Sequence, residues 1–248
     1  WGAAVVLLAA AAIAAAGGRH APPHAGAGGG SLATVLRDAR LWRIALLNLF
    51  SLGTLLAVQG LWGGPFLADV HGLDTIAVGD LLVLMGIGVV AGNLASGALA
   101  DRFGRRRVAL AGGGGFAAAH ALLVLLPPGT PTAVLGAVYL AFGALASFGV
   151  VLLAQARSAF PEHLGGRALT TVNLIGIGGA MLVQWAMGAI IEAGRDPSGA
   201  YGAAAYRPAF ALTTLLGAVA LACYAGLRDP AAAAARAPGP AGERTSPP

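Results

Sequence analysis

The sequence of 248 residues has no lysine, a single cysteine and few charged or aromatic side chains. Charged residues make up 10% of the chain, whereas soluble proteins carry about 25%. This shortage of charge excludes an ordinary soluble globule, because such a globule could not cover its surface. The lone Cys223 excludes an intrachain disulfide and a cysteine-based metal site. Aromatic residues are also scarce, at 6%, while glycine occurs 39 times, which favours closely packed helices over a core of large side chains.

What the chain does contain is long apolar runs: hydrophobic residues make up 57% of it, and its mean hydropathy is +0.77. A bilayer core about 30 Å thick is crossed by about 20 apolar residues in a helix. The runs lack the two-residue period of strands, and a helix satisfies its own backbone polar groups in lipid. We therefore expect an all-α fold, a polytopic transmembrane helical bundle. Its predicted spans are residues 1–17, 44–67, 81–100, 108–126, 132–156, 168–191 and 208–227.

The segments around these spans predict the domain organisation. Residues 1–17 are interpreted as a truncated transmembrane helix, because the chain opens with Trp1 inside an apolar run, and we expect the part before it to be missing. Residues 18–43 are predicted to be a cytoplasmic linker that carries an interfacial helix at 31–42. Residues 44–227 then form a six-helix transmembrane bundle. Residues 228–248, rich in Ala, Pro and Gly, are predicted to be a disordered cytoplasmic tail.

The arginines predict the orientation in the membrane. When alternate ends of the spans are assigned to two sides, 13 of the 15 arginines fall on one side, and only Arg195 and Arg207 on the other. An excess of Lys and Arg marks the cytoplasmic side. We therefore expect a multi-pass protein of the cell inner (plasma) membrane with a cytoplasmic C-terminus. The arginines form loop clusters instead of one basic face, so the pI of about 10.3 does not indicate a nucleic-acid partner.

One loop, between the third and fourth spans, has an unusual composition. A small residue ends the helix, an acid leaves the membrane, a glycine permits the reversal, and three arginines anchor the return at the interface. A plain stop-transfer loop is the alternative, since any basic cluster would serve it, but such a loop needs no acid. The run reads Gly97-Ala-Leu-Ala-Asp101-Arg102-Phe-Gly104-Arg105-Arg106-Arg107.

This run is similar to the G-x-x-x-D-R-x-G-R-R-R motif of the major facilitator superfamily of secondary transporters, and it matches at every defined position. In that family the motif lies between helices two and three and, in weaker form, between helices eight and nine. The arginine motif of helix four is absent from residues 132–156, and the Gly-Pro pair of helix five is absent from 168–191. The resemblance therefore implies the C-terminal part of the fold, helices six to twelve. A first half with an extra leading helix is the alternative.

The resemblance also implies that Asp101 and the arginines of the motif belong to a cytoplasmic gate that helps to hold the outward-facing state. Loss of the pairing would let the two halves rock apart during alternating access. We expect Arg157, just past the end of the 132–156 span, to be the partner of Asp101. Arg167, at the start of the next span, is the competing partner.

Amide side chains predict a substrate pathway. Asn48 and Gln59 are eleven residues apart, close to three helical turns, so they share a face, with Ser51 near it. Asn173 and Gln184 repeat the same spacing in the 168–191 span. Buried amides in hydrocarbon are costly unless they are paired or hydrated, so these residues fit the wall of a cavity. Hydrogen bonds between helices are an equally good interpretation.

Other features are best interpreted structurally. Small residues recur at four-residue intervals and predict close helix packing. The first such stripe is Gly88, Gly92, Ser96 and Ala100, and the second is Gly176, Ala180, Gln184 and Gly188. Tyr139 is expected to pack, and His120 is expected to be a packed neutral imidazole, with a proton relay as the alternative. Acids occur only near the ends of the predicted spans, as with Asp80 and Glu192.

These observations predict a secondary active transporter that moves a small solute by alternating access. A non-transporting membrane sensor or scaffold is the alternative. No catalytic arrangement of side chains is visible, so we expect neither an enzyme nor a cofactor or metal site. The expected partners are a small-molecule substrate of unknown identity, a coupling proton or other ion, the lipid bilayer and the missing N-terminal half of the same protein.

Overall fold

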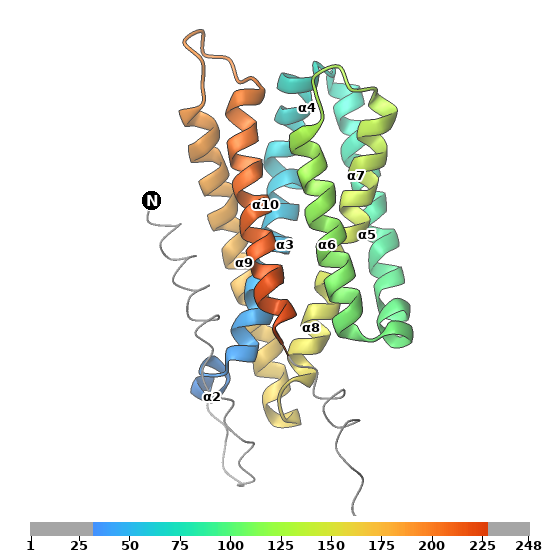
Figure 1. Ribbon diagram of the computed structural model, residues 1–248, viewed down its shortest axis with the longest axis vertical. Coiled ribbons are helices and arrows are strands. Elements are labelled where there is room, and N and C mark those ends of the chain that lie inside the picture. Colours follow the sequence, from blue (N-terminus) through green and yellow to red (C-terminus); the bar gives the residue numbers. More distant parts are fainter. Residues whose placement is uncertain (1–31, 228–248) are drawn as a thin grey trace, which may run out of the picture.

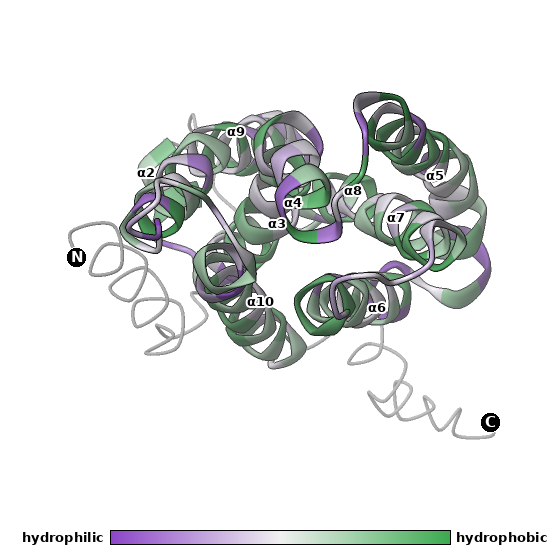
Figure 2. Ribbon diagram, turned by 90° about the horizontal axis from the view of Figure 1, so that it is seen from above, coloured by the Kyte–Doolittle hydropathy of each residue, from purple (hydrophilic) through white to green (hydrophobic). Residues whose placement is uncertain are grey.

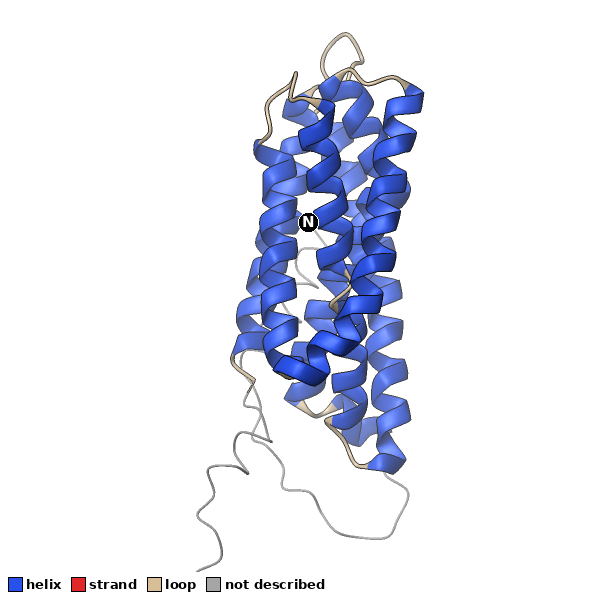
Figure 3. Cartoon of the chain, turned by 90° about the vertical axis from the view of Figure 1, so that its right-hand side faces the viewer, coloured by secondary structure: helices blue, strands red, loops and turns tan. Residues whose placement is uncertain are grey.

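The computed structural model describes residues 32–227, and these form six long helical spans packed side by side (Figure 1). The predicted span 1–17, most of the predicted linker and the predicted tail 228–248 lie outside the described residues. Within residues 32–227 there is no strand, and the loops lie mainly at the two ends of the bundle (Figure 3). The predicted all-α transmembrane bundle is therefore confirmed. The elements are α2 (Leu32–Leu36), α3 (Ala39–Ala57), the π-helical turn η1 (Val58–Trp62), α4 (Gly63–His71), α5 (Thr75–Phe103), α6 (Arg105–Leu125), α7 (Thr132–Ala146), α8 (Gly149–Ser158), α9 (Glu162–Ala193) and α10 (Ala203–Ala225).

Two helices, α3 and α5, begin earlier than predicted because an acidic cap precedes each of them. Asp38 accepts a hydrogen bond from the Arg40 backbone N–H at 2.8 Å, so α3 starts at Ala39 and the predicted interfacial helix at 31–42 is broken before it. Only the short α2 stays separate. In the same way Asp74 accepts a hydrogen bond from the Ala77 N–H at 2.8 Å, so α5 starts at Thr75 and not near residue 81.

The first span, Ala39–His71, is the most deeply buried of the six, and it consists of α3, η1 and α4. Seen from above, it lies between α9, α10 and the α5–α8 side of the bundle (Figure 2). The most extensive helix contacts are those of α3 with α9 and of α5 with α7, while α10 packs on α3, α6 and α9. The span α5 is the least buried and presents a long apolar flank that includes Ile76, Val83 and Leu94.

Small residues allow these close contacts, as the stripes predicted. A Cβ added at Gly88 would lie 2.2 Å from the Leu140 carbonyl oxygen, and one added at Gly143 would lie 2.1 Å from that of Met85. The backbones of α5 and α7 are therefore in direct contact. On the other pair of helices, a Cβ at Gly176 of α9 would lie 2.3 Å from Nδ2 of Asn48 on α3. The interpretation of the two stripes as packing surfaces is confirmed at Gly88 and Gly176.

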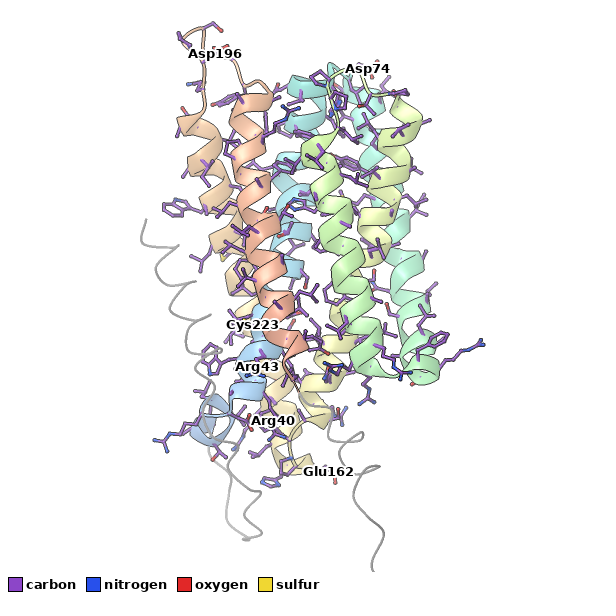
Figure 4. The ribbon with its side chains drawn as sticks, in the orientation of Figure 1. Arg40, Arg43, Asp74, Glu162, Asp196 and Cys223 are labelled. Atoms are coloured by element: carbon purple, nitrogen blue, oxygen red, sulfur yellow. The ribbon has the colours of Figure 1, made fainter. Side chains whose placement is uncertain are left out.

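The described arginines divide between the two ends of the bundle. The end that holds Arg40, Arg43 and Glu162, labelled in Figure 4, also holds the turn between α5 and α6, and we call it the arginine-rich end. The opposite end holds Asp74 and Asp196, together with Arg195. Chain direction alternates from span to span, so within residues 32–227 each loop between spans falls at the end that the sequence predicted for it.

Candidate functional site

The turn between α5 and α6 is built on Gly104. This residue alone separates the two helices, and its φ of +88° lies in a region that side-chain-bearing residues rarely adopt. The Gly104 N–H bonds to the Ala100 carbonyl at 2.9 Å, and Gly104 in turn accepts a hydrogen bond from the Val108 N–H at 3.2 Å. The reversal predicted from the glycine in the motif is confirmed.

Two arginines of this turn form hydrogen bonds to the C-terminal ends of other helices. The Arg106 guanidinium donates to the Leu227 carbonyl at 3.1 Å and to the Ala225 carbonyl at 2.6 Å, at the C-terminal end of α10. Arg105 donates to the Ser158 hydroxyl at 2.8 Å, at the C-terminal end of α8. Cations are favoured at helix C-termini because unpaired carbonyls gather there. These links join segments far apart in the sequence, which the motif alone did not predict.

The expected partner of Asp101 is not found in the described part of the chain. Asp101 is exposed and forms no ion pair with Arg157 or Arg167 within residues 32–227. The reason is positional: Asp101 lies on the exposed last turn of α5, while Arg105 occupies the nearby end of α8. Arg157 packs instead against Gly165 of α9, where a Cβ would lie 2.7 Å from the Arg157 carbonyl oxygen.

The remaining residues of the motif face outward. Gly97 is exposed, with no other group within 4 Å of an added Cβ. Arg102 is exposed, and its guanidinium carbon lies 5.3 Å from the centre of the Phe103 ring. Arg107 is exposed in the first turn of α6. The motif therefore divides into residues that hold the bundle together, such as Gly104 and Arg106, and residues that face the surroundings.

The amides predicted to line a pathway include two that join α3 to α9. Asn48 of α3 donates to the Val172 carbonyl of α9 at 3.2 Å, and Gln184 of α9 donates to the Leu56 carbonyl of α3, also at 3.2 Å. The Trp62 indole N–H adds a bond to the Gln184 carbonyl at 3.2 Å. For Asn48 and Gln184 the geometry thus matches the alternative interpretation, hydrogen bonds between helices.

The other candidates lie apart from these two. Ser51 is buried and donates to the Leu47 carbonyl of its own helix at 2.8 Å, and it faces a small cavity of about 20 Å³ between α3, α6 and α10. Asn173 is partly exposed on α9. Gln59 is partly exposed in η1, and its Nε2 lies 3.9 Å from the position of a Cβ on Gly86 of α5. The five residues therefore do not form one polar face.

The first span is interrupted at η1, a feature that the sequence analysis missed. Pro65 lacks an N–H, so it cannot bond to the Leu61 carbonyl four residues before it, and its ring crowds that carbonyl. Directly upstream, the Gly63 N–H bonds to Val58, five residues back, which is the π-helical pattern. Such single-turn bulges are frequent at functional sites. Pro65 was the signal in the sequence that could have predicted this break.

The interruption is held in place from two sides. The Trp62 indole reaches α9, where a Cβ on Gly188 would lie 2.8 Å from the indole ring. On the other side the Tyr139 hydroxyl of α7 donates to the Gly63 carbonyl at 3.3 Å. Tyr139 is fully buried, so its predicted role as a packing residue fits this contact. Gln59 and the exposed Gly60 lie on the open side of the same turn.

His120 is buried in α6 among aromatic rings, including those of Phe142 at 5.7 Å and Phe210 at 5.4 Å between centroids. Its Nδ1 lies 2.8 Å from the Thr214 hydroxyl, and its Nε2 has no hydrogen-bond partner among residues 32–227. This surrounding fits a packed imidazole. No group of three or more His, Cys, Asp or Glu side chains that could hold a metal ion occurs in the described part of the chain.

Acidic groups gather at the end opposite the arginine-rich end. Glu192 accepts a hydrogen bond from the Tyr201 hydroxyl at 2.5 Å and lies 3.4 Å from the Arg195 guanidinium. The bond to Glu192 raises the pKa of Tyr201. In the same loop, hydrogen bonds from the Ser198 hydroxyl and the Ala200 N–H lower the pKa of Asp196. These groups order the loop between α9 and α10.

Within residues 32–227, six helical spans are long and apolar enough to cross a bilayer and are joined by short loops, which defines a multi-pass membrane protein. A family model described as Major Facilitator Superfamily matches residues 44–247, and the chain therefore belongs to that superfamily. The resemblance inferred from the turn at residues 97–107 is confirmed. Members of this family are transporters and not enzymes, so the protein is a membrane transporter of the major facilitator kind. No curated protein matches the chain.

Proposed function

We propose that the protein is a secondary active transporter that moves a small solute by alternating access. Residues 32–227 form the C-terminal half of this transporter. The observation that carries this proposal is the π-helical turn η1 within the most buried span. Transporters place substrate near the membrane midplane, where discontinuous helices free backbone groups for binding. Here the π-helical turn contains Gln59, which is partly exposed on the side toward α5, and Gly60, which is exposed.

Within this proposal the pathway residues have different roles. Gln59 and Asn173 are the amides that bind the solute, because both side chains are partly exposed and form no hydrogen bond within residues 32–227. Asn48 and Gln184 position the two helices that carry them. The wall opposite these helices is formed by the N-terminal half of the transporter.

The arginine-rich end is proposed to be cytoplasmic. Nine of the described arginines lie at that end, and only Arg195 and Arg207 lie at the other. Asp101 then stands at the cytoplasmic rim with its carboxylate exposed. We infer that its gating partner belongs to the N-terminal half, since no described arginine pairs with it.

The test is a flux assay on the full-length transporter in proteoliposomes, with a panel of small solutes and an imposed proton or sodium gradient. Gradient-dependent uptake or efflux supports transport, and the ion that drives it identifies the coupling ion. Solute binding without flux, in vesicles shown to be sealed, would instead support the membrane-sensor alternative. Labelling of an engineered cysteine at Arg102 from outside intact cells would contradict the proposed orientation.

A further inference from the structure

A groove opens on the flank of the bundle between α5 and α6, close to the arginine-rich end. It encloses about 650 Å³, within the range of about 300–1,000 Å³ typical of small-molecule sites. Its walls are mainly apolar, with Ala95 and Leu99 on α5 and Val108 and Ala111 on α6. Phe148 closes the back, packed so tightly that a Cβ on Gly112 would lie 2.6 Å from its Cβ atom.

The groove exists because α5 packs along α7 and not along α6. The contact of α5 with α7 is extensive and runs through Gly88 and Gly92, whereas α5 and α6 contact each other little beyond the turn at Gly104. The two helices therefore diverge from that turn, with α7 behind them. The space between them is lined mainly by apolar residues and opens toward the side of the bundle, where lipid lies around a membrane protein.

The charged side chain that lines the groove is Arg107. Its neighbours in the turn are already engaged, since Arg105 bonds to α8, Arg106 bonds to α10, and Arg102 lies against Phe103. Arg107 is exposed and forms no hydrogen bond or ion pair within residues 32–227. The groove thus combines an apolar trough with one cation at the end where a membrane-spanning helix emerges from the bilayer.

We propose that this groove binds an anionic phospholipid, with an acyl chain between α5 and α6 and the phosphate at Arg107. In a leaflet the charged head group lies at the membrane surface and the acyl chains lie beneath it. The site has the same order, with Arg107 near the end of the bundle and the apolar trough next to it. Basic pockets between transmembrane helices bind anionic head groups by this chemistry. A water-soluble anion would leave the apolar trough unfilled. The proposal requires only that the bundle spans a membrane, and it does not depend on the solute or the coupling ion.

The first experiment measures lipid binding to the full chain in detergent by native mass spectrometry. The probes are dioleoyl phosphatidylglycerol, which is anionic, and dioleoyl phosphatidylcholine, which has the same chains and no net charge. We expect tighter binding of the anionic lipid by about five-fold, the effect of one arginine at a membrane surface. Arg107→Gln should abolish this preference. Arg102→Gln, which removes the same charge outside the groove, should retain it.

A second pair of variants tests the apolar trough. Ala95 lines the groove and Ala98 does not, although both are exposed on α5. Ala95→Leu should weaken binding of both lipids, and Ala98→Leu should not. Unfolding midpoints equal to wild type show that the variants fold. Equal losses in Arg107→Gln and Arg102→Gln, no preference for the anionic lipid, or displacement of the lipid by inorganic phosphate alone would overturn the proposal.

Discussion

Asn48 and Gln184 join α3 and α9 in opposite directions, each donating its amide N–H to a backbone carbonyl of the other helix. The acceptors, Val172 and Leu56, would otherwise bond only within their own helices. Each amide nitrogen therefore has a hydrogen-bond partner inside the bundle. The two bonds lie at different depths along the same helix pair, and together they fix its alignment.

We expect Asn48→Ala and Gln184→Ala to lower stability without changing solute affinity. Each substitution removes one interhelical hydrogen bond, which is worth about 0.6 kcal/mol on average within membranes and at most about 1.7 kcal/mol. Thermal unfolding in detergent measures the loss, and the solute KM in proteoliposomes measures affinity. A large rise in KM with an unchanged unfolding midpoint would mean that these amides line the pathway.

Gln59→Ala should weaken solute affinity with little loss of stability. Its side chain is partly exposed at the interruption of the first span and forms no hydrogen bond within residues 32–227, so little stability is at stake. If Gln59 contacts the solute, the loss of one hydrogen bond of about 1 kcal/mol raises KM about five-fold. Unaltered transport kinetics of Gln59→Ala for every transported solute would remove it from the proposed pathway.

Gly88→Ala should destabilise the bundle strongly. The added Cβ would lie 2.2 Å from the Leu140 carbonyl oxygen, and because this is backbone, α5 and α7 must separate. Overpacking of this kind costs about 1–3 kcal/mol. Gly79→Ala on the same helix is the matched control, since its Cβ meets nothing within 4 Å. The control should be neutral or slightly stabilising, and equal unfolding midpoints for the two variants would contradict the close packing.

Arg106→Ala should loosen the end of α10. The guanidinium bonds to the carbonyls of Ala225 and Leu227, and a cation at a helix C-terminus contributes about 0.3–1 kcal/mol. Hydrogen exchange at the last turn of α10 should therefore become faster. In Arg107→Ala, which removes a neighbouring charge with no such bonds, exchange should stay unchanged. Equal exchange rates in both variants would show that Arg106 does not hold this helix end.

His120→Phe should fold as well as the wild type and keep transport. The phenyl ring suits the surrounding aromatic rings and removes the buried Nε2, which has no partner within residues 32–227. Thr214 stays satisfied because its hydroxyl also donates to the Phe210 carbonyl at 2.8 Å. In the wild type the unpaired Nε2 costs about 1–3 kcal/mol. The phenyl ring removes this cost, so the unfolding midpoint should not fall. Abolished transport in a folded variant would favour the proton-relay interpretation.

The long-range architecture could be predicted where it depends on local composition. Apolar length specified the six described spans, and the glycine at position 104 specified the reversal between α5 and α6. The helix starts were missed although Asp38 and Asp74 are visible as capping residues. These acids stabilise helix ends outside the hydrophobic runs, so a search for apolar stretches alone begins α3 and α5 too late.

The site was harder to predict because it depends on contacts between residues far apart in the sequence. Helical spacing put Asn48, Ser51 and Gln59 near one face, but Asn48 and Ser51 are buried by neighbouring helices while Gln59 is partly exposed. Asp101 was paired with Arg157 from loop proximity, whereas Arg105 reaches the end of α8 instead. The bonds from Arg106 cross 119 and 121 positions, and no local pattern indicates them.

The bonds from Arg106 to the end of α10 also have a mechanical meaning. Residues after 227 continue directly from the helix end that this guanidinium holds. Because Arg106 lies two residues after Gly104, we expect a pull on the chain beyond Leu227 to reach the turn at Gly104 through these hydrogen bonds. The turn at Gly104 is thus linked to the C-terminal end of α10. A tether attached after Leu227 is therefore expected to change the position of α5 relative to α6.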